Sequence, residues 1–216
     1  MTMTSSGTPH FVIVDSGNYF STQTIQETKK RDDCFVIDMY DLPERDLSPY
    51  ACMVIDNFVD QELLYQEREQ IWQFLNQGKV LIFSGHMFLP WLPGASMFVP
   101  KLIRSQHDYE VSIVQQHPIF DGVDPEEMTY TKGVSGFFAR GHHPLPSQAE
   151  VLLSLPGGEP ITYIDRYSTQ GTILVHSGNN LFAYSGQGST VGRIGSQLQN
   201  WTREEYRAIQ ERTRTL

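Results

Sequence analysis

Five short apolar runs constrain the fold of this chain more than any other feature of its sequence. They cover residues 11–14, 34–37, 52–55, 80–83 and 172–175. None alternates with polar residues, which is typical of strands that are buried on both faces, as in a parallel sheet. The first three runs end in an aspartate, at Asp15, Asp38 and Asp56. We therefore predict a parallel sheet whose strands carry acidic residues at their carboxyl ends.

The segments between these runs favour helices. Residues 18–31 are polar enough for an exposed helix. A second helix is predicted between Asp60, which can cap its start, and Gly78, which suits the position just after its end. Its apolar face consists of Leu64, Ile71 and Leu75, with Leu63, Trp72 and Phe74 beside them. These features predict a flavodoxin-like α/β fold, doubly wound with a mainly parallel sheet, in which ligand sites lie at the carboxyl ends of the strands.

Beyond Gly94 the pattern changes to shorter apolar stretches separated by turns that contain proline and glycine. These stretches lie at residues 109–114, 134–139, 151–155 and 161–164. They predict an antiparallel extension of the sheet. A C-terminal helix is predicted to start at Thr202, because Thr202 and Glu205 have the spacing of a capping box, with Trp201 and Tyr206 placed as a hydrophobic staple.

The charge balance narrows the range of partners. A net charge of −9 leaves no dense basic face for a nucleic acid or for an anionic membrane surface. Residues 1–9 lack the basic and apolar regions of a leader peptide and are predicted to be a disordered tail, followed by a single domain over residues 10–216. No apolar run approaches the length of about 20 residues that spans a bilayer. We expect a soluble, cytoplasmic protein.

The order of elements and several short phrases resemble the class I glutamine amidotransferase-like domains. The phrases are "VID", "FLNQGKVLIFSG", "HPIFDGV" and "GTILVHSGNNL", in that order along the chain. As a pattern the resemblance covers residues 11–201. It is greatest to the branch without glutaminase activity, which includes proteins of the trehalose-utilisation type. The resemblance implies a domain of the same fold with a functional edge at the carboxyl ends of its strands.

Catalytic members of that family carry a cysteine on a tight elbow in a Gly-x-Cys-x-Gly setting. The elbow here reads Phe-Ser-Gly-His-Met over residues 83–87, with no cysteine and no flanking pair of glycines. Cys34 and Cys52 belong to earlier strands and read as small buried side chains, so neither can supply an exposed thiolate. The sequence argues against glutaminase activity and leaves other enzymatic activity open.

Polar side chains that follow the predicted strands are candidates for a site. Ser84, His86 and His176 are the catalytic candidates, and a working histidine pair should have both rings close together and open to solvent. The predicted ligand-binding residues are Asp15, Ser16, Asp56, Ser84, Gly85, His86, His142, His176, Asn179 and Asn180. Histidines with Asp15 or Asp56 are also metal-ligand types, but their spacing matches no metal motif. We predict no metal and no cofactor.

The segment after the elbow is too apolar for a free loop. Its large apolar side chains are Met87, Phe88, Trp91, Leu92, Met97 and Phe98. Either they fold over the sheet edge as part of the core, or they form a contact with another protein, for which Trp and Met are typical. Pro90, Pro93 and Gly94 break any regular element there. We therefore predict an interface with a partner protein or with a second copy of the chain.

Two functional hypotheses follow from these features. The first is an amidotransferase-like module without catalytic activity that binds a small polar ligand or a protein partner at the old active-site edge. The alternative is a hydrolase or sugar-modifying enzyme, as the trehalose-utilisation resemblance implies, with His86 and His176 as acid and base.

Overall fold

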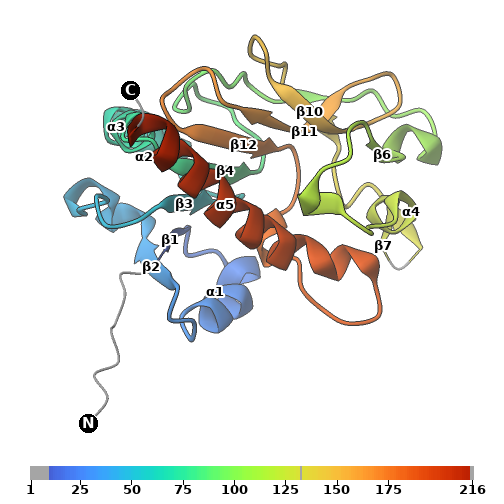
Figure 1. Ribbon diagram of the computed structural model, residues 1–216. Coiled ribbons are helices and arrows are strands. Elements are labelled where there is room, and N and C mark those ends of the chain that lie inside the picture. Colours follow the sequence, from blue (N-terminus) through green and yellow to red (C-terminus); the bar gives the residue numbers. More distant parts are fainter. Residues whose placement is uncertain (1–9, 132, 215–216) are drawn as a thin grey trace.

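A computed structural model describes residues 10–131 and 133–214, so the predicted tail at residues 1–9 lies outside the described residues. Its centre is an eight-stranded sheet in the order β2-β1-β3-β4-β12-β11-β10-β6 (Figure 1). The strands are β1 (Phe11–Asp15), β2 (Cys34–Asp38), β3 (Cys52–Ile55), β4 (Val80–Ser84), β6 (Ser112–Ile113), β10 (Glu150–Ser154), β11 (Pro160–Asp165) and β12 (Thr172–His176). Two small sheets pair β5 (Val99–Pro100) with β9 (Gly141–His142) and β7 (Tyr130–Thr131) with β8 (Val134–Ser135).

The predicted fold class is confirmed. Strands β2, β1, β3, β4 and β12 pair in parallel, and β4 lies in the middle between β3 and β12. This 2-1-3-4 order followed by one more strand is that of flavodoxin-like folds. β11, β10 and β6 continue the sheet in antiparallel pairing, as the turn-rich second half of the sequence predicts.

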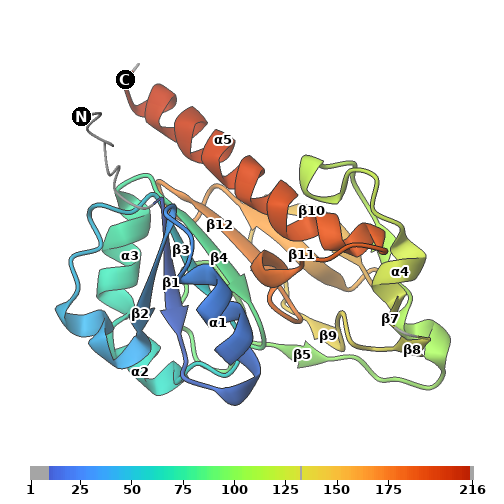
Figure 2. The same ribbon diagram turned by 90° about the horizontal axis from the view of Figure 1, so that it is seen from below.

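Helices cover both faces of the sheet (Figure 2). The α-helices are α1 (Thr22–Thr28), α2 (Gln61–Gln66), α3 (Arg68–Asn76), α4 (Pro125–Thr129) and α5 (Ile194–Arg214). Short 3-10 helices are η1 (Tyr19–Ser21), η2 (Met39–Glu44), η3 (Gln106–Tyr109), η4 (Pro118–Phe120), η5 (Leu181–Ala183) and η6 (Thr190–Arg193). Alternate residues of β4 face the helices on opposite sides of the sheet. Val80 and Ile82 pack towards α1 and α5, whereas Leu81 and Phe83 pack towards α2 and α3.

The helix predicted before β4 is present and has the predicted ends. Asp60 Oδ1 accepts hydrogen bonds from the backbone N–H groups of Glu62 and Leu63, at 3.0 and 3.2 Å. Gly78 has a φ of +71°, the left-handed conformation that ends helices. The segment divides into α2 and α3 at Glu67, which the sequence pattern does not predict.

The predicted start of the C-terminal helix is wrong. α5 begins at Ile194, and Thr202 lies inside it with its hydroxyl donating to the carbonyl of Leu198 at 2.7 Å. Glu205 does not cap the helix either. Gly195 lets the first turn pack closely against the backbone of η5, where an added Cβ would lie 2.3 Å from the Tyr184 carbonyl oxygen. This tertiary contact leaves no signal in the capping pattern.

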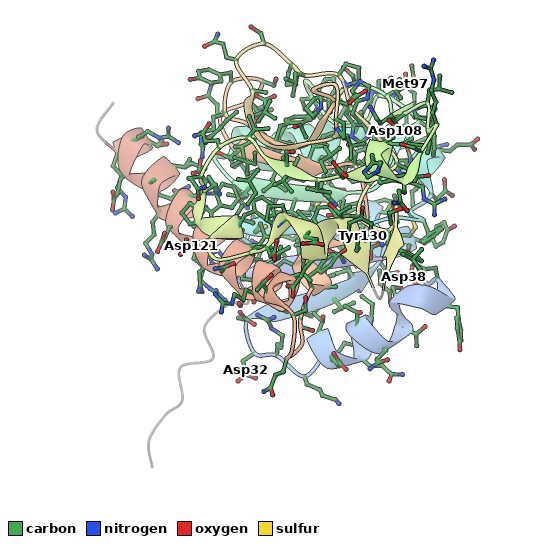
Figure 3. All side chains as sticks on the ribbon, turned by 90° about the vertical axis from the view of Figure 1, so that its right-hand side faces the viewer. Asp32, Asp38, Met97, Asp108, Asp121 and Tyr130 are labelled. Atoms are coloured by element: carbon green, nitrogen blue, oxygen red, sulfur yellow. The ribbon has the colours of Figure 1, made fainter. Side chains whose placement is uncertain are left out.

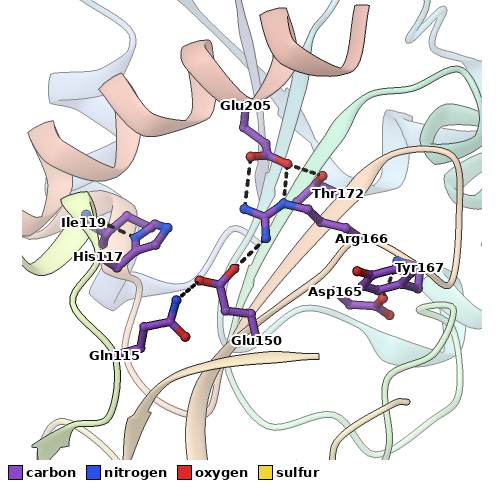
Figure 4. Close-up of polar contacts among 9 residues, drawn as sticks. All are labelled: Gln115, His117, Ile119, Glu150, Asp165, Arg166, Tyr167, Thr172 and Glu205. Carbon is purple, nitrogen blue, oxygen red and sulfur yellow. Dashed lines mark hydrogen bonds and ion pairs between the residues drawn. The ribbon is translucent and has the colours of Figure 1, made fainter. Parts of the chain in front are cut away.

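Glu205 instead holds the antiparallel half of the sheet against α5. Arg166, which follows β11, donates to Glu205 at 2.7 Å and to Glu150 on β10 at 2.6 Å (Figure 4). Glu205 also accepts from the Thr172 hydroxyl at 2.7 Å, and Gln115 donates to Glu150 at the same distance. The network therefore joins β10, β11, β12 and α5 through one arginine.

The antiparallel extension is partly as predicted. β10 and β11 lie within one or two residues of the predicted stretches, but the stretch at 109–114 contains only the two residues of β6. The stretch at 134–139 contributes only β8, because Gly133 and Gly136 adopt positive φ values that interrupt a strand.

The predicted interface segment is divided between core and surface. Met87, Trp91 and Leu92 are buried in the layer that contains α2 and α3, so they are not available to a partner, and that part of the prediction is wrong. The turns that Pro90, Pro93 and Gly94 impose allow these side chains to fold back over Phe83 rather than outward. Phe88 and Met97 are 60% and 57% exposed, and Figure 3 labels Met97 at the surface. Phe98 is half-buried.

Candidate functional site

A cavity of about 560 Å³ opens beside the carboxyl ends of β3 and β12. It is lined by Ser21, Thr24, Asp56, Asn57, Phe58, Asn179, Asn180, Ala183, Tyr184 and Ser185, and we call it the first cavity. Its walls come from η1 and α1, from the segment after β3 and from the segment that includes η5. β1 and β3 are the neighbours at which the strand order reverses, the place where flavodoxin-like sheets bind ligands.

Asp56 is the acidic group of the first cavity. Its Oδ2 atom accepts a hydrogen bond from the Asn180 amide at 3.2 Å, whereas its buried Oδ1 atom accepts none from the described residues. Burial, more than the nearby charge of Asp15, raises the pKa of Asp56 to about 6. Among the described residues, no cationic side chain counteracts this rise in pKa. The Asp56 carboxylate thus accepts a single side-chain hydrogen bond from the described residues.

Local contacts fix the asparagines around Asp56. The Asn180 side-chain oxygen accepts from the backbone N–H of Phe182 at 3.0 Å, which turns its amide nitrogen towards Asp56. Asn179 donates to the Phe137 carbonyl at 2.8 Å, and Asn57 donates to the Gly178 carbonyl at 3.3 Å. These bonds are made within the chain and hold the polar side chains of the lining in place.

Phe58 follows these polar residues in a strained conformation. Its φ of +67° lies in the left-handed region, which is unusual for an aromatic residue. The ring is 68% exposed. Such outliers cluster at functional sites, where the surrounding structure holds them in place.

A second cavity of about 550 Å³ adjoins the first, because Asn57 and Phe58 line both. The second cavity is lined by Asn57, Phe58, Val59, Asp60, Gln61, Glu62, His86, Phe88 and Leu89. Gln61 fixes its far wall: its amide donates to the His86 carbonyl at 2.7 Å and its oxygen accepts from the Phe88 N–H at 2.6 Å.

His86 and His176 do not form an open pair. His176 is fully buried, and its Nδ1 atom lies 2.8 Å from the Thr162 hydroxyl. Burial lowers the pKa of His176 to about 3, so the ring stays neutral. His86 lines the second cavity with its ring stacked on Phe98 at 3.7 Å between centroids. The prediction that both rings are open to solvent is wrong for His176, because its strand lies in the middle of the sheet.

Ser84 is not placed as a nucleophile. It is fully buried at the end of β4, where its hydroxyl oxygen accepts from the Leu181 N–H at 3.2 Å. Next to it, Gly85 has a φ of +150° and donates to the His176 carbonyl at 2.8 Å. A Cβ on Gly85 would lie 2.4 Å from the Asn57 side-chain oxygen. The elbow shape is thus present, but Ser84 and Gly85 support the cavity wall and do not line it.

His142 and His143 lie away from both cavities. His142 is half-buried in β9 and lines neither cavity. His143, which the sequence argument did not select, is buried with one ring nitrogen 2.9 Å from the Ser177 hydroxyl and the other accepting from the Met87 N–H at 3.2 Å. Burial lowers the pKa of His143 to about 3. Within residues 10–131 and 133–214, no group of three or more His, Cys, Asp or Glu side chains could hold a metal ion.

Both cysteines are free and buried, as their strand positions predict. Burial raises the pKa of Cys34 to about 12 and raises that of Cys52 well above the ordinary thiol value. A thiol that stays protonated is a poor nucleophile.

Four of the predicted ligand-binding residues line the cavities. Asp56, Asn179 and Asn180 line the first cavity, and His86 lines the second. Asp15 and Ser16 line neither: Asp15 accepts from the Gly17 N–H at 2.9 Å, and it acts on Asp56 through its charge. The sequence analysis missed seven lining residues of the first cavity, which lie two to nine residues beyond the ends of β1, β3 and β12: Ser21, Thr24, Asn57, Phe58, Ala183, Tyr184 and Ser185. Only Asn57, next to Asp56, carries a signal in its position.

Comparisons with known proteins show a glutamine amidotransferase-like fold. No family model and no curated protein sequence matches the chain. Among solved structures, cytoplasmic protein STM1381 from Salmonella typhimurium LT2 is 10% identical with a TM-score of 0.57, covering 90% of this chain and 98% of that chain. Cytoplasmic protein STM3548 from Salmonella typhimurium is 13% identical with a TM-score of 0.56, covering 88% and 98%. A glutamine amidotransferase from Thermotoga maritima is 12% identical with a TM-score of 0.50, covering 96% and 93%.

These likenesses concern the fold, because identities this low do not carry an activity from one protein to another. Within the described residues, no helix has the length and apolar character needed to cross a bilayer.

Proposed function

We propose that this chain is an amidotransferase-like module without catalytic activity that binds a small polar ligand in the first cavity. One observation carries the proposal: Asp56 and Asn180 line a cavity at the point where the strand order reverses, and the Asn180 amide holds the Asp56 carboxylate there. The half-buried carboxylate accepts one hydrogen bond from the described residues, so a ligand that donates to it from the cavity would add a favourable interaction.

The chemistry around the cavity supports binding without catalysis. A hydrolase of the family type needs an exposed nucleophile next to a base. Ser84 is buried and engaged with Leu181, and the thiols of Cys34 and Cys52 lie inside strands. His176 is held neutral in the core. None of these groups lines either cavity.

Filling the first cavity should abolish ligand binding. Ala183 lines the cavity, and we expect Ala183→Phe to occupy part of its volume. The matched control is Ala208→Phe, because Ala208 is exposed on α5 and lines neither cavity. Two-dimensional amide NMR with a panel of small cationic, neutral and anionic compounds should show shifts at residues 56–58 and 179–185 in the native protein and in the control, and none in Ala183→Phe. Shifts that map to another surface, or a panel in which nothing binds, would contradict the proposal.

A second candidate function, self-association, is favoured by a separate observation. Four apolar side chains on the segment after the elbow are exposed: Phe88, Met97, Val99 and Leu102. They lie on one short segment of the chain, and exposed apolar side chains that gather in a patch are typical of protein contacts. We expect light scattering after size-exclusion chromatography to give the mass of a dimer, and Met97→Asp to shift the protein towards monomer. A native protein that is monomeric at every concentration would exclude this candidate.

A further inference from the structure

The first cavity is acidic. Asp56 is the carboxylate among its lining residues, and those residues include no lysine, arginine or histidine. Asp15 adds a second negative charge close enough to act on Asp56. Tyr184 stays neutral near pH 7, since burial raises its pKa to about 12. The sign of the charge therefore disfavours anionic ligands and favours cationic ones.

The hydrogen bonds of the cavity point the same way. Asn180 donates to one oxygen of Asp56, and no described residue donates to the other. An ammonium group in the cavity supplies the Asp56 carboxylate with both hydrogen-bond donors and a countercharge, whereas a hydroxyl supplies one donor and no charge. A buried carboxylate gains more from a cation than an exposed one does, because water screens the pair less.

The second cavity adds apolar surface that a ligand could contact. Phe58 lines both cavities and is exposed to them, while Val59, Phe88 and Leu89 line the second alone. His86 at that wall adds no positive charge near pH 7, because burial and the nearby Arg140 lower its pKa. Asp60 and Glu62 make the rest of the wall acidic. A ligand that extends from Asp56 past Phe58 therefore contacts the apolar side chains that line the second cavity.

We propose that the two cavities together bind a small primary amine, with its ammonium group against Asp56 and its apolar part against Phe58. This inference rests on the proposed function and narrows the ligand to one chemical class. An aromatic or aliphatic amine of this kind needs no cofactor and no covalent step.

Calorimetry with matched probes tests the class of ligand. The probes are 2-phenylethylamine, its neutral analogue 2-phenylethanol, the anion phenylacetate, and ethylamine, which lacks the ring. We expect 2-phenylethylamine to bind at least about tenfold more tightly than 2-phenylethanol, phenylacetate not to bind, and ethylamine to bind more weakly because it loses the contact with Phe58.

Two variants separate the charge from the fold. Asp56→Asn keeps the size of the side chain and the acceptor for Asn180, and should cost the amine at least about tenfold in affinity while leaving 2-phenylethanol unchanged. Asp38→Asn removes the same charge from the end of β2, which β1 separates from β3. Asp38 is exposed and lines neither cavity, so this variant should bind the amine as the native protein does.

The outcomes separate this inference from the proposed function. Three results would overturn the inference that the ligand is an amine while leaving a ligand site in the cavity. They are equal binding of the amine and the alcohol, tighter binding of phenylacetate, and full affinity for the amine in Asp56→Asn. Failure of 2-phenylethylamine to bind, when other compounds of the NMR panel shift residues 56–58, would do the same. Absence of any binding at these residues would overturn both.

Discussion

Replacement of Phe83 by alanine is expected to lower the free energy of unfolding by about 3 to 5 kcal/mol, the usual cost of truncating a large core side chain. Phe83 is 1% exposed on β4, which pairs in parallel with β3 on one side and β12 on the other. Its ring meets that of Trp91 edge to face, with 5.1 Å between centroids. The truncation therefore leaves a cavity beneath the segment that forms the wall of the second cavity.

His86→Ala is the control, three residues away on the same elbow. His86 is half-buried and stacks on one ring, so its loss should cost about 1 kcal/mol or less. Urea unfolding of the two variants measures both values. A loss for His86→Ala that equals or exceeds the loss for Phe83→Ala would show that the elbow is part of the core and not the rim of a site.

Asp56→Asn is expected to stabilise the folded protein at neutral pH by about 1 to 3 kcal/mol. A carboxyl whose pKa rises from 3.8 to about 6 on folding makes the folded state less stable by about 3 kcal/mol once it is ionised. Asparagine removes the charge that burial and Asp15 disfavour. The native aspartate thus lowers the stability of the folded protein at a site proposed to bind a ligand. Functional sites commonly reduce stability in this way.

The sign of the pH dependence follows from the raised pKa. The native protein keeps the full stability of the neutral carboxyl below the unfolded pKa of about 3.9, and loses it as the pH rises through about 6. The gap between Asp56→Asn and the native protein should therefore be largest above pH 6 and vanish near pH 4. Chemical unfolding at a series of pH values measures the gap, with Asp38→Asn as the charge-matched control. A gap that is constant with pH, or that has the opposite sign, would show that Asp56 does not titrate as described.

The parallel half of the fold was predictable because its strands leave a local signal. A run such as 80–83 is apolar at every position only if both of its faces are covered, and that requirement alone implies helices on each side. Asp60 and Gly78 could likewise be assigned as helix ends, because capping depends on neighbouring residues.

The errors arose where contacts distant in sequence decide the structure. Thr202 and Glu205 have the spacing of a capping box, but α5 continues through them because the turn at Gly195 packs on η5 and Arg166 takes up Glu205. An apolar residue such as Trp91 suits either a protein core or an interface. Only the packing of its ring against Phe83 places it in the core.

The candidate site was predictable to the extent that strand ends locate it. Asp56 and Asn180 follow parallel strands, and parallel strands place their carboxyl ends along one edge. The position of Phe58 was not predictable, because its left-handed backbone carries no sequence signal of the kind that glycine gives. His176 was misjudged because a residue that ends a strand in the middle of a sheet can be covered by the next segment of chain.

The pairing of β4 with β12 has a consequence for the order of folding. The two strands lie side by side in the sheet, yet residues 85–171 separate them along the chain. Closing so long a loop costs entropy before any contact repays it, so contacts within residues 10–84 should form first and β12 should dock later. Asn179 and Asn180 follow β12 directly, so the wall that faces Asp56 is assembled in the last steps. A nascent or partly folded chain would then have no complete first cavity, and ligand would be captured only by molecules that have finished folding.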